Sequence, residues 1–91
     1  MKIVINKCFG GFEVSKEALK ELGTNYWGED EDDRKDSRLV AMVEKDSEKA
    51  SGWCAKLAVV EIPDEATDYY LDEYDGFEEI IYVLDGKLHW A

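Results

Sequence analysis

The stretch "TDYYLDEYDGFEEIIYVLDGKLHWA" (residues 67–91) decides the fold class of this chain. It contains two Asp-Gly pairs, at residues 75–76 and 85–86. The first stands between runs rich in tyrosine and isoleucine, and the second leads from such a run into "KLHWA". Asp-Gly between two such runs is typical of a two-residue β-hairpin turn of type I′. The C-terminal third is therefore predicted to be an antiparallel three-stranded meander.

Two further strands are predicted upstream of this meander. Residues 3–5 are all β-branched, which favours a strand at the N-terminus. Residues 55–62 form a second apolar run, and Pro63 ends it because proline cannot donate to a ladder.

Two helices are predicted between those strands. Ser15 is a good N-cap for a helix over residues 16–22, and Gly23 is a stop signal. A second helix is expected over residues 37–49 because its apolar side chains recur on one face. The charged stretch between the helices, residues 25–36, lacks periodicity and is expected to be an exposed, mobile loop.

These elements predict a single α+β domain over residues 1–91. An antiparallel sheet would combine the N-terminal strand with the C-terminal three-stranded meander, and two helices would pack on one face of it. A hydrophobic fraction of 45% and eleven aromatic residues favour a folded chain over a disordered one.

The sequence also bounds the cellular setting. No apolar run approaches the roughly 20 residues that span a bilayer, and the first residues are too soon polar for a signal peptide. The two cysteines do not make a disulfide framework, so we expect a location in the reducing cytoplasm.

Charge is the feature that best predicts partners. The net charge is −11, and residues 50–91 carry ten acidic side chains against Lys56 and Lys87, which is −8. Such a surface repels nucleic acid and membrane headgroups and attracts basic proteins. The expected partner is therefore a basic protein, with no direct binding of nucleic acid and no binding to a membrane. The oligomeric state stays open.

Eight acidic residues fall within residues 64–79, and tyrosines are interleaved with them. Period two places Asp68, Tyr70, Asp72 and Tyr74 on one face of their strand. Carboxylates at every second residue would lie about 6.5–7 Å apart, close to the spacing of phosphates along a nucleic acid. The alternative is a solubilising outer face with charges that protect strand edges. The candidate partner-binding residues are Asp64, Glu65, Asp68, Tyr70, Asp72, Glu73, Asp75, Glu78 and Glu79.

Other patterns give weaker signals for chemistry. Gly10-Gly11, between a strand and a helix, has the order of a phosphate-binding loop but matches neither glycine-rich motif, so a structural turn is favoured. Cys8 or Cys54 could form a nucleophile pair with His89, but two buried free thiols and a partly exposed imidazole are the simpler interpretation. Residues 30–36 lack the ligand spacing of an EF-hand. We predict no enzymatic activity, no cofactor and no metal.

Two segments carry a resemblance to a known family. "KIVINKCFGGFEVSKEAL" (residues 2–19) and "AKLAVVEIPDEATDYYLDEYDGFEEI" (residues 55–80) resemble small, uncharacterised proteins of bacteriophages and prophages. The signatures are "INKCFGGF" and "VVEIPD…EYDG", and the likeness covers most of the chain. The ending differs, because members finish with a more basic segment where this chain has "IIYVLDGKLHWA". The resemblance implies no activity, but small acidic phage proteins are often inhibitors of host enzymes.

These observations favour a phage-type acidic binding protein. It would block a basic nucleic-acid-binding surface of a host protein such as a defence nuclease, as anti-CRISPR proteins do, some of which mimic DNA. Two alternatives stay open. One is a small-ligand or nucleotide-binding domain that uses the Gly10-Gly11 corner. The other is a structural module that associates with itself through tyrosine and through Trp27, Trp53 and Trp90.

Overall fold

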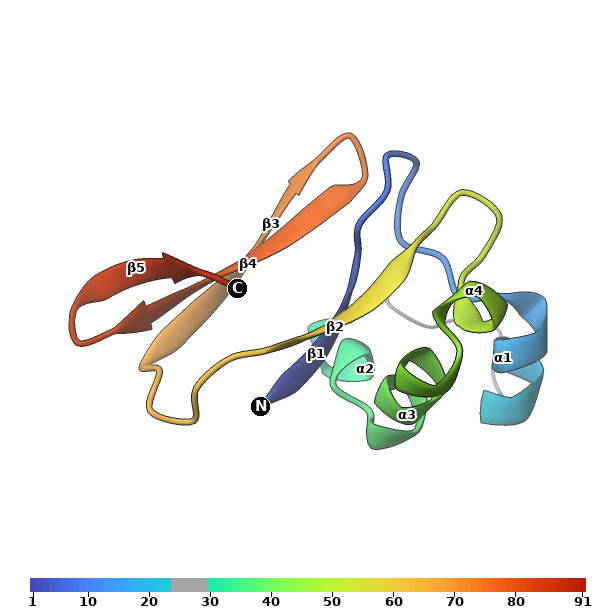
Figure 1. The fold of residues 1–91 in the computed structure, drawn as a ribbon, viewed down its shortest axis with the longest axis horizontal. Coiled ribbons are helices and arrows are strands. Elements are labelled where there is room, and N and C mark those ends of the chain that lie inside the picture. The colour runs from blue at the N-terminus through green and yellow to red at the C-terminus, as the bar shows by residue number, and fades with distance from the viewer. Residues whose placement is uncertain (24–29) are drawn as a thin grey trace.

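The structure is a computed structural model that describes residues 1–23 and 30–91. The described part has an α+β fold with four helices and five strands, in which meander and helices lie at opposite ends of the molecule (Figure 1). The predicted fold class is confirmed, including the N-terminal strand and the C-terminal three-stranded meander. The elements are β1 (Lys2–Asn6), α1 (Lys16–Leu22), α2 (Glu31–Arg34), α3 (Ser37–Lys45), α4 (Ser47–Ala50), β2 (Leu57–Glu61), β3 (Asp68–Tyr74), β4 (Phe77–Leu84) and β5 (Lys87–Trp90).

The strands divide into two antiparallel sheets, where the sequence predicted one. Strand β1 pairs with β2, from Lys2 opposite Glu61 to Asn6 opposite Leu57. Strands β3, β4 and β5 form the meander in that order. Both predicted turns are present, and Asp75, Gly76, Asp85 and Gly86 all have positive φ angles, as type I′ turns require.

The first helix forms as its sequence signals predict. The Ser15 hydroxyl accepts a hydrogen bond from the Ala18 amide at 3.1 Å, and Gly23 takes the left-handed conformation at the C-terminus of the helix.

The second predicted helix is divided into two, because α3 ends at Lys45 and α4 starts at Ser47. Asp46 between them has extended backbone angles, and its carboxylate accepts from the Lys49 amide.

The expectation of a loop over residues 25–36 is wrong in part. Residues 25–29 lie outside the described residues. The remainder contains the short helix α2, whose N-cap Asp30 accepts a hydrogen bond from the Asp32 amide. Helix α2 positions Arg34, which is 6% exposed. Local propensity missed this turn because a buried contact with a distant strand, described below, holds it.

Strand β1 is buried on both faces, and each face belongs to a different core cluster. Val4 packs with the helices and Leu57, while Ile3 and Ile5 pack with Ile80 of the meander. Successive side chains of a strand point to opposite faces, so one apolar run serves both clusters. Strand β1 therefore joins the helical half of the molecule to the meander.

The end of β1 is connected to the meander by polar contacts. The Asn6 amide nitrogen Nδ2 donates to the Gly76 carbonyl at 2.6 Å and to the Cys8 carbonyl at 2.7 Å. The Gly10 amide donates to the Asp75 carbonyl at 3.0 Å. The Asp75-Gly76 turn thus lies directly against the Gly10-Gly11 corner.

We expect Gly76→Ala to destabilise the protein by about 2–4 kcal/mol. Gly76 has a φ of +87°, and an added Cβ would collide with the Gly11 nitrogen and lie 2.7 Å from its Cα. Gly86→Ala is the matched control. Gly86 occupies the same turn position with a φ of +74°, but a Cβ added there would have no described atom within 4 Å to collide with. It should cost about 1 kcal/mol, the conformational cost alone. Urea unfolding measures both, and equal losses would contradict the close contact.

Candidate functional site

The candidate site is the face of the meander that points away from strand β1. Its other face packs on the core through Tyr69, Leu71 and Tyr82. Because side chains alternate along a strand, the strand register assigns the remaining positions to the opposite side. We call this side the outer face; it comprises Asp68, Tyr70, Asp72, Tyr74, Phe77, Glu79, Ile81, Val83, Leu88 and Trp90.

The outer face exposes large apolar side chains. Tyr74 is 76% exposed, Trp90 61% and Leu88 57%, while Ile81 and Val83 are half-buried. Phe9, from the segment after β1, extends the surface, because its ring lies 5.4 Å from that of Phe77. Exposed apolar side chains gathered on one face in this way mark interaction sites. Tyrosine and tryptophan are also enriched where proteins bind one another.

Carboxylates lie between these aromatic side chains. Asp72 is directly opposite Glu79 across strands β3 and β4. The neighbouring rows are Tyr70 opposite Ile81 and Tyr74 opposite Phe77. Like charges directly opposite each other destabilise a sheet. In the part of the chain that the structure describes, no ion pair involves either carboxylate.

Asp68 lies at the start of the same face and interacts with Tyr70. A hydrogen bond with Asp68, aided by its negative charge, raises the pKa of the Tyr70 hydroxyl above its usual value. Tyr70 therefore stays protonated and neutral at physiological pH. The outer face accordingly offers neutral aromatic rings and negative carboxylates, which suit a surface containing lysine or arginine.

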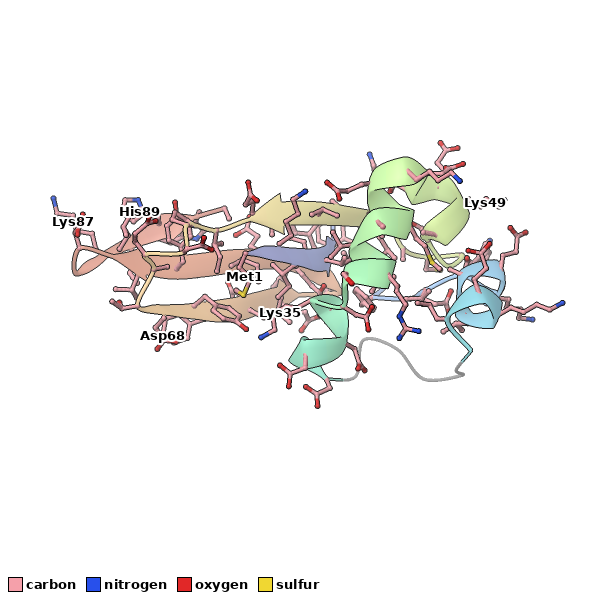
Figure 2. The ribbon with its side chains drawn as sticks, turned by 90° about the horizontal axis from the view of Figure 1, so that it is seen from below. Met1, Lys35, Lys49, Asp68, Lys87 and His89 are labelled. Carbon is pink, nitrogen blue, oxygen red and sulfur yellow. The ribbon has the colours of Figure 1, made fainter. Side chains whose placement is uncertain are left out.

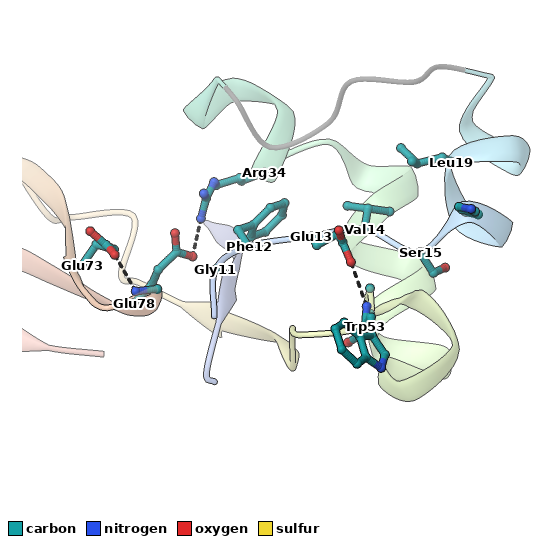
Figure 3. Close-up of a pocket in the computed structure, with 14 residues that line it drawn as sticks. Gly11, Phe12, Glu13, Val14, Ser15, Leu19, Arg34, Trp53, Glu73 and Glu78 are labelled. Carbon is teal, nitrogen blue, oxygen red and sulfur yellow. Dashed lines mark hydrogen bonds and ion pairs between the residues drawn. The ribbon is translucent and has the colours of Figure 1, made fainter. Parts of the chain in front are cut away.

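Glu78 is the clearest correction to the predicted site. It is 4% exposed, and its Oε1 accepts hydrogen bonds from the Arg34 guanidinium at 2.5 Å and from the backbone amide of Asn6 at 2.8 Å. Figure 2 shows the side chains around the meander and helices, and Figure 3 shows Glu78 directed at Arg34. Glu78 therefore cannot contact a partner, because the ion pair buries its carboxylate.

Four other predicted residues also lie away from the outer face. Glu73 accepts a hydrogen bond from the Gly76 amide at 2.5 Å, which fixes the hairpin turn. Asp75 belongs to that turn. Asp64 and Glu65 are exposed between β2 and β3, where Asp64 pairs with the N-terminal amine at 3.1 Å. The structure thus brings together Asp68, Tyr70, Asp72 and Glu79 of the nine candidates.

The predicted spacing of carboxylates, which resembled that of phosphates in a nucleic acid, is wrong. On the outer face of β3, aromatic and acidic residues alternate, so Asp68 and Asp72 are four residues apart. That is about 13 Å along a strand, twice the spacing expected from the sequence. The outer face is a mixed acidic and aromatic surface rather than a ladder of charges.

No protein-family model, curated protein or solved structure that was compared with this chain matches it. The function must therefore be inferred from the geometry of the site.

The Gly10-Gly11 corner has the contacts of a structural turn. The Gly10 amide is used by Asp75, and an added Cβ at Gly10 would lie 2.8 Å from the Cys54 carbonyl oxygen. An open cleft of about 760 Å³ lies beside the corner, lined in part by Phe12, Trp53 and Lys16 (Figure 3). Glu13, Glu73 and Glu78 also line it, and Glu78 already pairs with Arg34. The negative charge of these glutamates disfavours the binding of a phosphate in the cleft.

Of the residues considered for catalysis, the two cysteines differ from the sequence expectation, whereas His89 is partly exposed as expected. Cys54 is exposed and Cys8 is half-buried, so the expectation of two buried thiols is wrong. His89 stacks on Tyr82, with ring centroids 5.2 Å apart. The described residues contain no cluster of three or more histidine, cysteine or acidic side chains that could hold a metal. Within residues 1–23 and 30–91, none of the helices is long and apolar enough to cross a membrane.

Sequence reasoning missed Leu88, Trp90 and Phe9 as members of the site. The alternation of "KLHW" and its position after Asp85-Gly86 could have placed Leu88 and Trp90 beside Ile81 and Val83. No sequence signal places Phe9, since its contact with Phe77 depends on packing between the corner and the hairpin.

Proposed function

We propose that this chain is a binding protein whose outer face covers a basic surface of a partner protein where nucleic acid otherwise binds. The observation that carries the proposal is the Asp72–Glu79 row, which has no ion pair among the described residues and lies between Tyr70 and Tyr74 on an exposed sheet face. Two opposed carboxylates destabilise the free protein slightly, and a guanidinium or ammonium group from a partner would relieve that repulsion.

The rest of the surface supports the same function. Trp90, Leu88 and Tyr74 supply apolar area that a partner can bury, and such aromatic anchors carry much of the energy of protein interfaces. The net charge of −11 would speed encounter with a basic surface. The resemblance to phage proteins favours a host enzyme that acts on nucleic acid, such as a defence nuclease, as the partner.

Competition with nucleic acid tests this function. The protein is immobilised, exposed to a bacterial lysate, and washed with duplex DNA or tRNA at constant ionic strength. We expect retained basic proteins to be released by either polynucleotide, because both ligands use the same surface. The immobilised protein itself should retain no polynucleotide.

The control for that experiment is an uncharged polymer of similar size, which should release nothing. Retained proteins that resist an excess of both polynucleotides would contradict the proposal. Binding of DNA or tRNA to the immobilised protein alone would contradict it as well, because a surface carrying −11 should repel phosphates.

A further inference from the structure

Strand β5 forms one edge of the meander, and its backbone is open to another strand. The order of the sheet is β3, β4, β5, so β5 has a neighbour on one side within the described residues. Figure 1 places β5 at the end of the molecule remote from the helices. Unpaired edge strands are templates for strand addition, and proteins normally protect them with charges, proline or bulges.

The register identifies which backbone groups of β5 are free. The two-residue turn makes Leu84 and Lys87 a hydrogen-bonded pair, and Tyr82 with His89 is the next. The Ala91 amide continues this pattern by donating to the Ile80 carbonyl at 2.9 Å. The amides and carbonyls of Leu88 and Trp90 therefore point away from β4, toward the open edge.

The other edge of the meander, strand β3, is protected against strand addition, so an added strand is directed to the β5 edge. Strand β3 carries Asp68, Asp72 and Glu73 along its length, and all three are exposed. The Tyr69 amide, which faces that edge, is capped by the Asp68 carboxylate at 2.8 Å. Strand β5 contains no acidic residue and no proline. Its charged residue, Lys87, lies beside the turn and, by alternation, on the face opposite Leu88 and Trp90, which are apolar and exposed.

We propose that the partner adds an extended, basic segment to the free edge of β5. The inference rests on the proposed function and names the mode of docking. Charge complementarity selects the occupant. A second copy of the chain would place its own net charge of −8 from residues 50–91 beside the same charge of the first copy, and the two would repel each other. A basic segment would instead be attracted by the negative charge. Backbone hydrogen bonds to Leu88 and Trp90 give affinity, and side chains next to the outer face give specificity.

The probe is a synthetic peptide of about six residues in which lysine and valine alternate, the length of a typical strand. It is compared with two versions that are N-methylated on the two alternate sets of residues. One set faces β5 and the other faces solvent. We expect one methylated version to lose binding at least about tenfold and the other to bind like the parent. Equal effects of the two versions, or no binding of the parent peptide, would overturn strand addition.

Two further measurements report on the protein. Leu88→Pro removes an amide that β4 does not use, so it should lower peptide affinity at least about tenfold while the meander stays folded. Leu88→Ala keeps that amide and should bind far better than Leu88→Pro. In the unaltered protein, saturating peptide should slow amide hydrogen exchange at Leu88 and Trp90 more than at Lys87 and His89. Unchanged exchange at Leu88 and Trp90 would overturn the proposal.

The outcomes separate this inference from the proposed function. In one outcome, the Asp72→Lys and Glu79→Lys double variant loses peptide binding, while N-methylation and Leu88→Pro have no effect. This outcome would support the outer face as the binding surface and overturn strand addition. The reverse pattern would retain strand addition and overturn the role of the acidic face. A concentration-dependent dimer that Leu88→Pro abolishes would assign the edge to a second copy and overturn the basic occupant.

Discussion

Glu78→Lys is expected to unfold most of the protein. Glu78 is 4% exposed and pairs with Arg34, which is 6% exposed, so a lysine there would place two positive charges together in the interior. Breaking a buried ion pair by removing one partner costs about 3–5 kcal/mol, and reversing the charge costs more. The total free energy of unfolding of a domain of this size is roughly 5–14 kcal/mol. The backbone amide of Asn6 would also lose its acceptor.

Two variants make this prediction specific. Glu79→Lys introduces the same charge change at the next position, which is half-buried on the outer face, and should change stability by less than about 1 kcal/mol. Glu78→Gln keeps an acceptor oxygen for the Asn6 backbone amide but removes the negative charge of Glu78 from beside Arg34, so an intermediate loss of about 1–3 kcal/mol is expected. Circular dichroism during urea unfolding measures all three. A stable Glu78→Lys variant would show that the buried pair does not hold α2 to the meander.

Replacing both Asp72 and Glu79 with lysine is expected to abolish partner binding and leave the protein folded. The two carboxylates are neighbours across the strands and lack a cation in the described structure, so their reversal removes the attraction and adds repulsion toward a basic partner. We expect at least about a 100-fold rise in the Kd of a captured partner. Because the double variant exchanges one cross-strand like-charge pair for another of the opposite sign, folding should be nearly unaffected.

The matched control is Glu17→Lys with Glu21→Lys, which gives the same net charge from exposed positions on α1. It should weaken binding far less, since α1 lies at the end of the molecule opposite the meander (Figure 1). Isothermal titration calorimetry against the captured partner at two salt concentrations separates local contacts from overall charge. Wild-type affinity should fall with salt because exposed charges are screened beyond about 8 Å at physiological ionic strength. Equal losses in the two double variants would reduce the carboxylates to a solubilising role.

Local signals in the sequence predicted much of the fold. Asp75-Gly76 and Asp85-Gly86 specify their turns because both positions need positive φ, which aspartate tolerates and glycine adopts freely. Ser15 and Gly23 specify α1 because they satisfy backbone groups within one turn of themselves. Period two in the meander then places Asp72 and Tyr70 together on one face, as observed.

Interactions between distant residues were not predictable in the same way. Helix α2 contradicts the expected loop because Arg34 finds an acceptor in Glu78, 44 residues further along the chain. The break at Asp46 divides the second helix, and the neighbouring Ser47 hydroxyl donates to the Leu57 carbonyl on β2. Neither contact has a periodic or local signature.

The sequence by itself therefore determined the α+β class, the meander, helix α1 and the negative charge of the C-terminal half. It did so because turns, caps and alternation act over a few residues, and net charge is a sum that needs no geometry. The tertiary structure alone decided which acidic residues are available to a partner. Glu78 became part of the interior and Glu73 part of a turn, whereas Asp72 and Glu79 stayed on an open surface with Trp90 and Tyr74. That selection depends on what packs against each face, because a buried carboxylate is tolerated only where a distant cation such as Arg34 reaches it.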